Sequence, residues 1–268
     1  MSAPLLEIQD VSKTFRRSRR EAVHAVRSVS LTVAAGETVA LVGESGSGKS
    51  TLGRIALGLL APDSGRVVVE GRALHELAGA ELRRARTRMQ PIFQDASAAL
   101  NPRRSAREHL LQALATRDCA TEREAVALLH SVGLQPGAEY LDRFPHELSG
   151  GQRQRLTIAR ALAPQPRLIV ADEPLSGADV SIRGQILNLL LDIKQATSIA
   201  YLLITHDISV ARAFCDRVAV MMRGEIVETG PADRVLTRPE HEYTRRLLAA
   251  VPTVPARRAP IAQAPQNN

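Results

Sequence analysis

The sequence GESGSGKS, residues 43–50, fits the pattern G-x-x-x-x-G-K-[S/T] of a phosphate-binding loop. Its glycines let the backbone wrap closely around phosphate oxygens and point N–H groups toward them. Lys49 would add a positive charge at the β- and γ-phosphates, and Ser50 a hydroxyl for Mg²⁺. The apolar segment 38–42 predicts a strand before the loop, and the segment 50–60 predicts a helix after it. This context favours a phosphate site over a structural glycine-rich turn, because it places the positive end of the helix dipole at the anion.

A second apolar strand, at residues 167–171, ends in the carboxylates Asp172 and Glu173. A buried strand that delivers an acid at its carboxyl end can hold Mg²⁺ through water, and Asp172 suits that role. Glu173 lies one residue further, where its carboxylate could polarise an attacking water. Many apolar strands end in acidic residues, so this pattern alone is weak evidence for a metal site. It becomes strong evidence because it follows the phosphate loop in the chain.

The order of the other elements predicts an α/β fold. Further strands are indicated at residues 64–70, 87–93, 199–205 and 217–223. Apolar residues recur at helical spacing between two of the strands, at Ile182, Ile186, Leu190 and Ile193. This alternation predicts a parallel sheet with crossover helices.

The middle of the chain, at about residues 105–163, is predicted to be helical instead. Its clearest apolar stripe is formed by Ala125, Leu128, Leu129 and Val132. Thr121, followed by Glu124, predicts a capping box at the start of that helix. The parallel-sheet pattern is therefore interrupted by an inserted helical region.

The composition excludes several classes of protein. The chain has 268 residues, 44% of them hydrophobic and 24% charged, so wholesale disorder and fibrous structure are excluded. Its apolar runs are far shorter than the roughly 20 residues of a membrane helix, and residues 1–10 lack a signal-peptide pattern. Cys119 and Cys215 are too few for a disulfide framework or a cysteine-built metal site. We therefore expect a cytosolic protein.

The net charge of +7 would suit nucleic acid or an anionic membrane surface. However, aromatic residues make up only 3% of the chain and tryptophan is absent, so few side chains could stack on bases. The charge alone therefore decides little about the partners of this protein.

The segment LSGGQ, residues 148–152, opens a predicted helix at 153–163 with one serine and two glycines. This is a second helix N-terminus suited to an anion. Because it stands between the phosphate loop and the Asp172–Glu173 strand, it resembles the signature of ABC-type ATPases. The resemblance covers about residues 5–251.

The resemblance implies a fold class as well as an activity. It implies an α/β protein with a P-loop NTPase (RecA-like) parallel-sheet core, an N-terminal antiparallel β subdomain and an inserted α-helical signature subdomain. Residues 1–251 would form one ABC nucleotide-binding domain, with its helical subdomain at about 95–163. Residues 252–268 would form a Pro/Ala-rich tail, which we expect to be disordered.

The same resemblance assigns roles to individual residues. Gln94 resembles the Q-loop glutamine that senses Mg²⁺ and the γ-phosphate, residues 176–179 (SGAD) resemble the D-loop, and His206 resembles the switch histidine. Phe15 occupies the position of an aromatic ring that contacts adenine. The implied catalytic residues are Lys49, Gln94, Glu173 and His206. ATP would contact Phe15, Gly43, Glu44, Ser45, Gly46, Ser47, Gly48, Lys49, Ser50, Thr51, Ser149, Gly150, Gly151, Gln152 and Asp179. Mg²⁺ would be held by Ser50, Gln94 and Asp172.

A narrower resemblance is to the ATPases of dipeptide, oligopeptide and nickel importers. It is found in residues 93–103 (FQDASAALNPR), 146–155 (HELSGGQRQR) and 241–252 (HEYTRRLLAAVP). Ala96 and Glu242 stand where that group has proline, and Gly177 and Ala178 replace alanine and leucine in the D-loop. No catalytic side chain is missing, so hydrolysis is still expected. The tail has no cysteine, so the iron–sulfur cluster of some relatives is not expected.

The resemblance implies an ATP-binding and ATP-hydrolysing subunit of an ABC importer for peptides or nickel, at the cytoplasmic face of the inner membrane. In the family, two such subunits meet head to tail, and each ATP lies between one phosphate loop and the partner's LSGGQ. The second subunit could be identical or paralogous. Further implied partners are two integral-membrane permeases, contacted by residues 95–104, and an extracytoplasmic substrate-binding protein. The transported substrate would not contact this chain, so the sequence leaves it open.

The alternative is a soluble, non-transport ABC ATPase that acts on nucleic acid or ribosomes. Such relatives usually carry coiled-coil, zinc-binding or second ATPase segments, whereas a single nucleotide domain and no repeat are found here. An exporter ATPase is disfavoured by the segment 241–252. We therefore expect no nucleic-acid partner.

Overall fold

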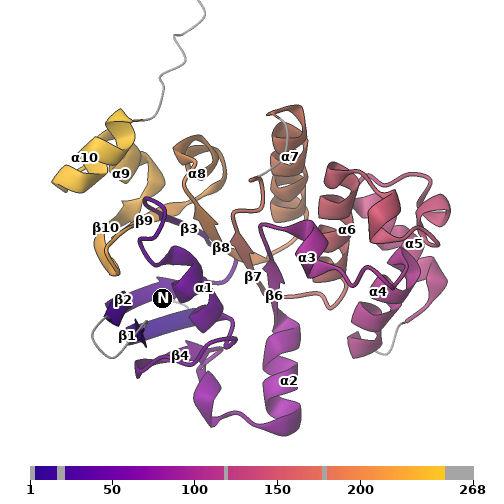
Figure 1. Cartoon of the computed structure of the whole chain (residues 1–268), viewed down its shortest axis with the longest axis horizontal. Helices are drawn as coiled ribbons and strands as arrows, with labels where there is room; N and C mark the ends of the chain where they lie inside the picture. Colours follow the sequence, from indigo (N-terminus) through magenta and orange to yellow (C-terminus); the bar gives the residue numbers. More distant parts are fainter. Residues whose placement is uncertain (1–3, 17–21, 118–119, 177–179, 251–268) are drawn as a thin grey trace, which may run out of the picture.

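The protein contains two β-sheets, with helices packed between and around them (Figure 1). The computed structural model describes residues 4–16, 22–117, 120–176 and 180–250. An antiparallel sheet has the strand order β2-β1-β4-β5, and a six-stranded sheet has the order β10-β9-β3-β8-β7-β6. The strands are β1 (Leu6–Arg16), β2 (Ala22–Val33), β3 (Thr38–Val42), β4 (Ser64–Val69), β5 (Arg72–Ala73), β6 (Met89–Ile92), β7 (Leu168–Asp172), β8 (Ala200–Thr205), β9 (Arg217–Met222) and β10 (Glu225–Pro231).

The six-stranded sheet is the centre of the fold. Strands β9, β3, β8, β7 and β6 pair in parallel, and β10 pairs with β9 in the antiparallel direction. Every residue of β3 and β8 is buried. Continuous apolar strands of this kind are typical of a parallel sheet that is covered on both faces. The strands run with their carboxyl ends toward the phosphate loop.

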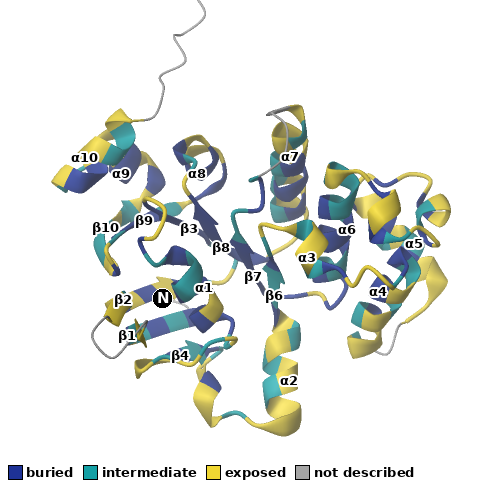
Figure 2. Ribbon diagram, in the orientation of Figure 1, coloured by how far each residue is buried: buried dark blue, intermediate teal, exposed yellow. Residues whose placement is uncertain are grey.

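Successive residues of the central strands enter two different cores. In β3, Val39 and Leu41 pack with α1 (Lys49–Ala56) and the antiparallel sheet, whereas Ala40 and Val42 pack with the helices on the opposite face. Helix α1 therefore lies between the two sheets, as Figure 1 shows, and its inward face is buried in Figure 2. This packing fixes the loop at residues 43–48 to the carboxyl end of β3.

The chain between β6 and β7 is largely helical. Its helices are α3 (Ala96–Ala99), α4 (Ala106–Leu114), α5 (Glu122–Ser131) and α6 (Gly150–Leu162), with 3₁₀ turns at Ala115–Arg117, Gly137–Tyr140 and Pro145–Glu147. Ser105 and Glu108 form a complete capping box at the start of α4. At the start of α5, Thr121 accepts the Glu124 N–H at 3.2 Å, so half of the predicted capping box is present.

The other helices surround the six-stranded sheet. They are α2 (Gly79–Arg88), α7 (Val180–Ala196), α8 (Ile208–Phe214), α9 (Ala232–Thr237) and α10 (Glu242–Ala249), with a 3₁₀ turn at Leu74–Glu76. Helices α7 and α8 bury their apolar residues on the face opposite α1. Helices α9 and α10 follow β10 and lie at that edge of the sheet (Figure 1).

Some boundaries differ from those expected from the sequence. Helix α1 ends at Ala56 and not near residue 60, because Gly58 adopts the left-handed conformation (φ +63°) that commonly ends a helix. The strand expected at 87–93 is only Met89–Ile92, since Thr87 belongs to the last turn of α2. Helix α2 buries none of its residues, so no apolar stripe marks it in the sequence.

Several predicted features lie outside the described residues. They are Cys119, the D-loop residues Gly177, Ala178 and Asp179, and the tail at 252–268. Within the part of the chain that the structure describes, no helix combines the length and apolar character needed to cross a bilayer.

Candidate active site

The phosphate loop joins β3 to α1 and rests directly on the backbone of two other strands. Gly43 has φ +153°, and a Cβ atom there would lie 2.2 Å from the carbonyl oxygen of Met221. Gly48 has φ +107°, and a Cβ atom there would lie 2.0 Å from the carbonyl oxygen of Ala25. Both positions therefore require glycine, for backbone angle and for space.

The turn between β9 and β10 also supports the loop. The Gly224 N–H donates to the carbonyl oxygen of Ser47 at 2.9 Å, and the Gly224 carbonyl oxygen accepts from the Arg27 N–H at 2.8 Å. Because Arg27 lies in β2, this one glycine links the loop to both sheets. The fold thus holds the loop in its curved form from two sides.

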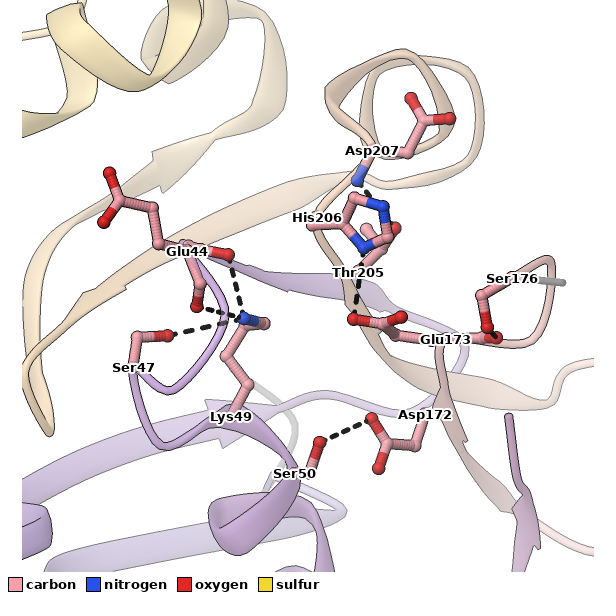
Figure 3. A network of polar contacts seen from close by, with 11 residues as sticks. Glu44, Ser47, Lys49, Ser50, Asp172, Glu173, Ser176, Thr205, His206 and Asp207 are labelled. Atoms are coloured by element: carbon pink, nitrogen blue, oxygen red, sulfur yellow. Dashed lines mark hydrogen bonds and ion pairs between the residues drawn. The ribbon is translucent and has the colours of Figure 1, made fainter. Parts of the chain in front are cut away.

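Lys49, the first residue of α1, is buried, and its ammonium group turns back into the loop (Figure 3). Its Nζ atom donates to the carbonyl oxygens of Gly43 and Glu44 at 2.8 Å each, and to Ser47 Oγ at 3.4 Å. Burial lowers the pKa of Lys49, and nearby carboxylates, first among them Glu173, act in the opposite direction. A cation removed from water and held by neutral carbonyl groups is well suited to bind an anion.

Ser50 and Asp172 bring two oxygen donors together beside the loop. The Ser50 hydroxyl donates to Asp172 Oδ1 at 3.0 Å (Figure 3). Burial raises the pKa of the Asp172 carboxyl group, although the hydrogen bond from Ser50 acts in the opposite direction. No group of three or more His, Cys, Asp or Glu side chains among the described residues could hold a metal by itself. The pair does fit Mg²⁺, which is usually bound through one or two protein oxygens together with waters and phosphates.

Glu173 has an uncommon backbone conformation for a residue other than glycine, with φ +47°. The Glu173 N–H donates to the Ile204 carbonyl at 2.8 Å, and the Ser176 hydroxyl donates to the Glu173 carbonyl at 2.9 Å. These bonds stabilise the strained turn. The side chains of Asp172 and Glu173 consequently point in different directions (Figure 3). The Nδ1 atom of His206, after β8, lies 3.1 Å from Glu173 Oε1 (Figure 3).

Gln94 and the LSGGQ segment border the same pocket, which no residue of the phosphate loop lines. Gln94, Ser149, Gly150 and Gly151 all border a pocket of about 580 Å³. The Ser149 hydroxyl accepts from the Gln152 N–H at 3.3 Å, and Gln152 Oε1 accepts from the Ser149 N–H at 2.9 Å, so both side chains cap α6. Among the described residues, no hydrogen bond joins the segment 149–152 to the phosphate loop.

The structure also places the remaining predicted site residues. Phe15 on β1 is 42% exposed, pairs across the strands with Val23, and has the Lys13 Nζ atom 5.9 Å from its ring centroid. Its ring is thus accessible and does not belong to the core. Thr51 is the third residue of α1 and is half-buried. Within the phosphate loop, the residues Glu44, Ser45 and Gly46 are exposed.

One residue of the site is not among those predicted. The hydroxyl of Tyr243, on α10, accepts a hydrogen bond from the Glu44 N–H at 3.0 Å. Tyr243 belongs to the segment 241–252 that carries the narrower resemblance, and this is the one signal in the sequence that points to it.

A parallel sheet, a glycine-rich loop that holds a lysine, and a carboxylate pair at the end of another strand of the same sheet define a P-loop nucleoside triphosphatase. A family model described as "ABC transporter" matches residues 26–176, more than half of the chain. The chain is 46% identical over 269 residues to a "Probable peptide ABC transporter ATP-binding protein y4tS" of Sinorhizobium fredii, covering 97% of this chain and 76% of the relative. It is 47% identical to the "Glutathione import ATP-binding protein GsiA" of Escherichia coli O157:H7, covering 96% of this chain but only 43% of that relative.

Solved structures give the same result. One neighbour is the ATP-binding cassette MJ0796, in a dimeric post-hydrolysis state bound to ADP and Pi, with a TM-score of 0.75, 30% identity, and coverage of 85% of this chain and 98% of that chain. Another is cbiO1 from Clostridium perfringens, part of the complex cbiONQ, with a TM-score of 0.75, 26% identity, and coverage of 89% and 93%.

The chain belongs to the ABC transporter family, and it is an ATP-binding cassette with the ATPase fold of that family. The predicted family and fold class are confirmed: the parallel core, the N-terminal antiparallel sheet and the helical insertion are all present.

Proposed function

We propose that this ATPase drives the uptake of short peptides through a membrane importer. The observation that carries the proposal is the convergence of Lys49, the Ser50–Asp172 pair and the Glu173–His206 pair at the carboxyl ends of neighbouring strands. The substrate class is supported by the names of two relatives, which describe peptide transport and glutathione import. Glutathione is itself a short peptide.

The triphosphate of ATP would lie in the phosphate loop. Lys49 has three N–H donors, so it would bind the β- and γ-phosphate oxygens while keeping its bond to the Gly43 carbonyl oxygen. The backbone N–H groups of residues 44–51 would surround the same phosphates. Phe15 would stack on the adenine ring, a role that its exposure on β1 supports.

Ser50 and Asp172 would hold Mg²⁺, with Gln94 completing the protein ligands. When bound, Mg²⁺ supplies positive charge that neutralises the phosphate oxygens. Lys49 and His206 would stabilise the charge that develops on the transferred group. Glu173 would act as the general base toward the attacking water, and its contact with His206 would keep its carboxylate in place.

The LSGGQ segment would act on the nucleotide of a second subunit. In support, Ser149 and Gly150 line a pocket away from the loop of their own chain. The two ATPase subunits, identical or paralogous, would meet head to tail, with ATP between one loop and the other signature. Asp179, in the D-loop, would lie at the same interface.

The segment 95–104 would contact a permease. Two of its residues, Ser97 and Ala98, are exposed on α3, so a membrane subunit could reach them. We further propose that residues 1–251 form one nucleotide-binding domain with a helical subdomain at about 95–163, and that the tail at 252–268 is not part of it. The protein would bind two permeases at the cytoplasmic face of the inner membrane, together with an extracytoplasmic binding protein.

The proposal is tested by co-expressing the chain with candidate permeases and a candidate binding protein from the same organism. We expect detergent pull-down to recover integral-membrane subunits, and reconstituted vesicles to accumulate a labelled di- or tripeptide when ATP is supplied. Recovery of nucleic acid instead of membrane subunits, or accumulation of nickel but not of peptide, would contradict the proposal.

A further inference from the structure

The peptide group between Gly43 and Glu44, at the start of the phosphate loop, is bound at both of its ends. Its carbonyl oxygen, on Gly43, accepts from Lys49 Nζ at 2.8 Å, and its N–H, on Glu44, donates to the Tyr243 hydroxyl at 3.0 Å. This peptide therefore supplies one of the three acceptors, with the Glu44 carbonyl and the Ser47 hydroxyl, that position the Lys49 ammonium group. Tyr243 fixes the orientation of this peptide from a different part of the chain.

Tyr243 is itself held rigidly. Its side chain is 5% exposed and its ring belongs to the core on the α10 side of the sheet. Glu228 on β10 accepts the N–H groups of Glu240 and His241 at 2.9 and 3.0 Å, and His241 Nδ1 accepts the Tyr243 N–H at 3.1 Å. These hydrogen bonds attach the start of α10 to β10. The position of the Tyr243 hydroxyl is therefore set by contacts other than the one with the loop.

The hydroxyl contact is not part of a tightly packed surface. A pocket of about 230 Å³ lies beside the loop and is lined by residues 44–47 and by Met222, Arg223, Tyr243 and Arg246. On this side of the loop a directional hydrogen bond, and not close packing, therefore holds the Gly43–Glu44 peptide. Loss of that bond would leave the Glu44 N–H without its restraint on this side, and it would not open a cavity in the core.

We propose that Tyr243 is a positioning residue of the nucleotide site, which holds the Gly43–Glu44 peptide and, through it, the Lys49 ammonium group in the orientation that a triphosphate requires. The inference rests on the proposed role of the phosphate loop in binding ATP. It makes α10, which lies outside the segment 26–176 matched by the family model, a part of that site. The energetic effect is preorganisation, because a loop held in its binding form loses less freedom when the ligand arrives.

The test compares Tyr243→Phe with Tyr201→Phe. Tyr243→Phe removes only the hydroxyl and keeps the ring in the core. Tyr201, on β8, is also a buried tyrosine, and its hydroxyl has no hydrogen-bond partner among the described residues, so it is a matched control. The dissociation constants of Mg·ATP and Mg·ADP are measured by calorimetry, together with the melting temperature without nucleotide and the KM and kcat for ATP.

For Tyr243→Phe we expect both nucleotides to bind roughly 2- to 10-fold more weakly, as for the loss of one hydrogen bond. The KM for ATP should rise by a similar factor while kcat changes less, and the melting temperature should stay within about 3 °C of wild type. Tyr201→Phe should bind nucleotide like wild type.

Three outcomes would overturn the inference: wild-type affinity in Tyr243→Phe, an equal loss of affinity in Tyr201→Phe, or a loss of affinity accompanied by a large fall in melting temperature. The last two would indicate a general structural effect. If the wild-type protein itself failed to bind ATP, the proposed function would be wrong. If the wild-type protein bound ATP and Tyr243→Phe bound it equally well, only the inference about Tyr243 would be wrong.

Discussion

Asp172 has to satisfy two opposing requirements. In the proposed mechanism its carboxylate holds a cation beside Ser50, yet burial raises the pKa of this carboxyl group and so disfavours its charged form. A carboxyl group with a raised pKa binds more protons in the folded protein than in the unfolded chain. Its contribution to stability therefore falls as the pH rises from the unfolded to the folded pKa, and the cost is fully present above the folded pKa.

Replacement of this carboxylate should therefore separate stability from function. We expect Asp172→Asn to raise the melting temperature of the nucleotide-free protein at pH 7 by roughly 1–4 °C, because the amide removes a half-buried charge and still accepts from Ser50. The Mg²⁺ concentration needed for nucleotide binding should increase by roughly 10- to 100-fold. Thermal unfolding and Mg²⁺ titration measure the two effects, with Asp192→Asn, at an exposed aspartate, as the control. A lower melting temperature for Asp172→Asn would show that the carboxylate stabilises the fold.

Glu173→Gln should reduce ATP turnover by roughly 10²- to 10⁴-fold, since an amide cannot act as a general base. Affinity for ATP should be retained, because no phosphate contact is removed, and the variant should accumulate as a closed dimer in size-exclusion chromatography with ATP and Mg²⁺. Phosphate release measures the turnover, and Glu139→Gln, at an exposed glutamate, is the matched control. Unchanged turnover would exclude Glu173 as the base, and lost ATP binding would make its role structural.

Among the elements, α6 is preceded by a residue, Ser149, that both caps the helix and borders a pocket. Ser149 caps the helix together with Gln152, and it presents the helix N-terminus at the pocket shared with Gln94. A change at Ser149 therefore alters both the stability of the helix and the proposed contact with a second subunit. To separate these two effects, a control variant is needed that removes the cap of a different helix.

Ser149→Arg should leave ATP binding to the isolated subunit within roughly 2-fold of wild type but reduce hydrolysis by about 10²-fold or more, because the bulky side chain obstructs the second subunit's nucleotide. The control is Thr121→Arg, which removes the cap of α5 at a similar cost of about 1 kcal/mol without touching the pocket. Calorimetry and phosphate release distinguish the two variants. Equal loss of ATP binding in monomeric Ser149→Arg would show that Ser149 acts within its own chain.

The elements also show which features of this fold can be read from a sequence. Strands β3, β7 and β8 are predictable because burial on both faces demands continuous apolar runs. Helix α2 is not, because it buries nothing and leaves no periodic trace. The phosphate loop is a local motif and is therefore visible, whereas Tyr243 meets Glu44 across 199 positions of sequence, a distance that no local spacing encodes.

At the scale of the whole molecule, the phosphate loop and the LSGGQ segment are carried by different parts of the fold. The loop is fixed between the two sheets, and LSGGQ opens a helix of the insertion between β6 and β7. The segment 95–104 belongs to that same insertion, so a permease bound there would act on the signature and not directly on the loop.

Negative charge on α3 should therefore separate transport from hydrolysis. We expect the double variant Ser97→Glu/Ala98→Glu to lose roughly tenfold or more of the peptide uptake of the reconstituted complex, because its charges would be buried unpaired at the proposed permease contact. The basal ATPase activity should remain within roughly 2-fold. Ala80→Glu, on the exposed α2, is the control for added charge. Normal uptake by the double variant would place the membrane contact elsewhere.

The position of Gly224 has a practical consequence for spectroscopy. Its amide proton points at the carbonyl of Ser47 in the phosphate loop, while its own carbonyl is bound to Arg27 in the antiparallel sheet. In ¹⁵N-labelled protein this single resonance is a built-in reporter, because occupation of the loop will alter the shielding of the proton and its exchange with deuterium. Titration of nucleotide can thus be followed at one glycine, with no dye attached and no residue of the site replaced.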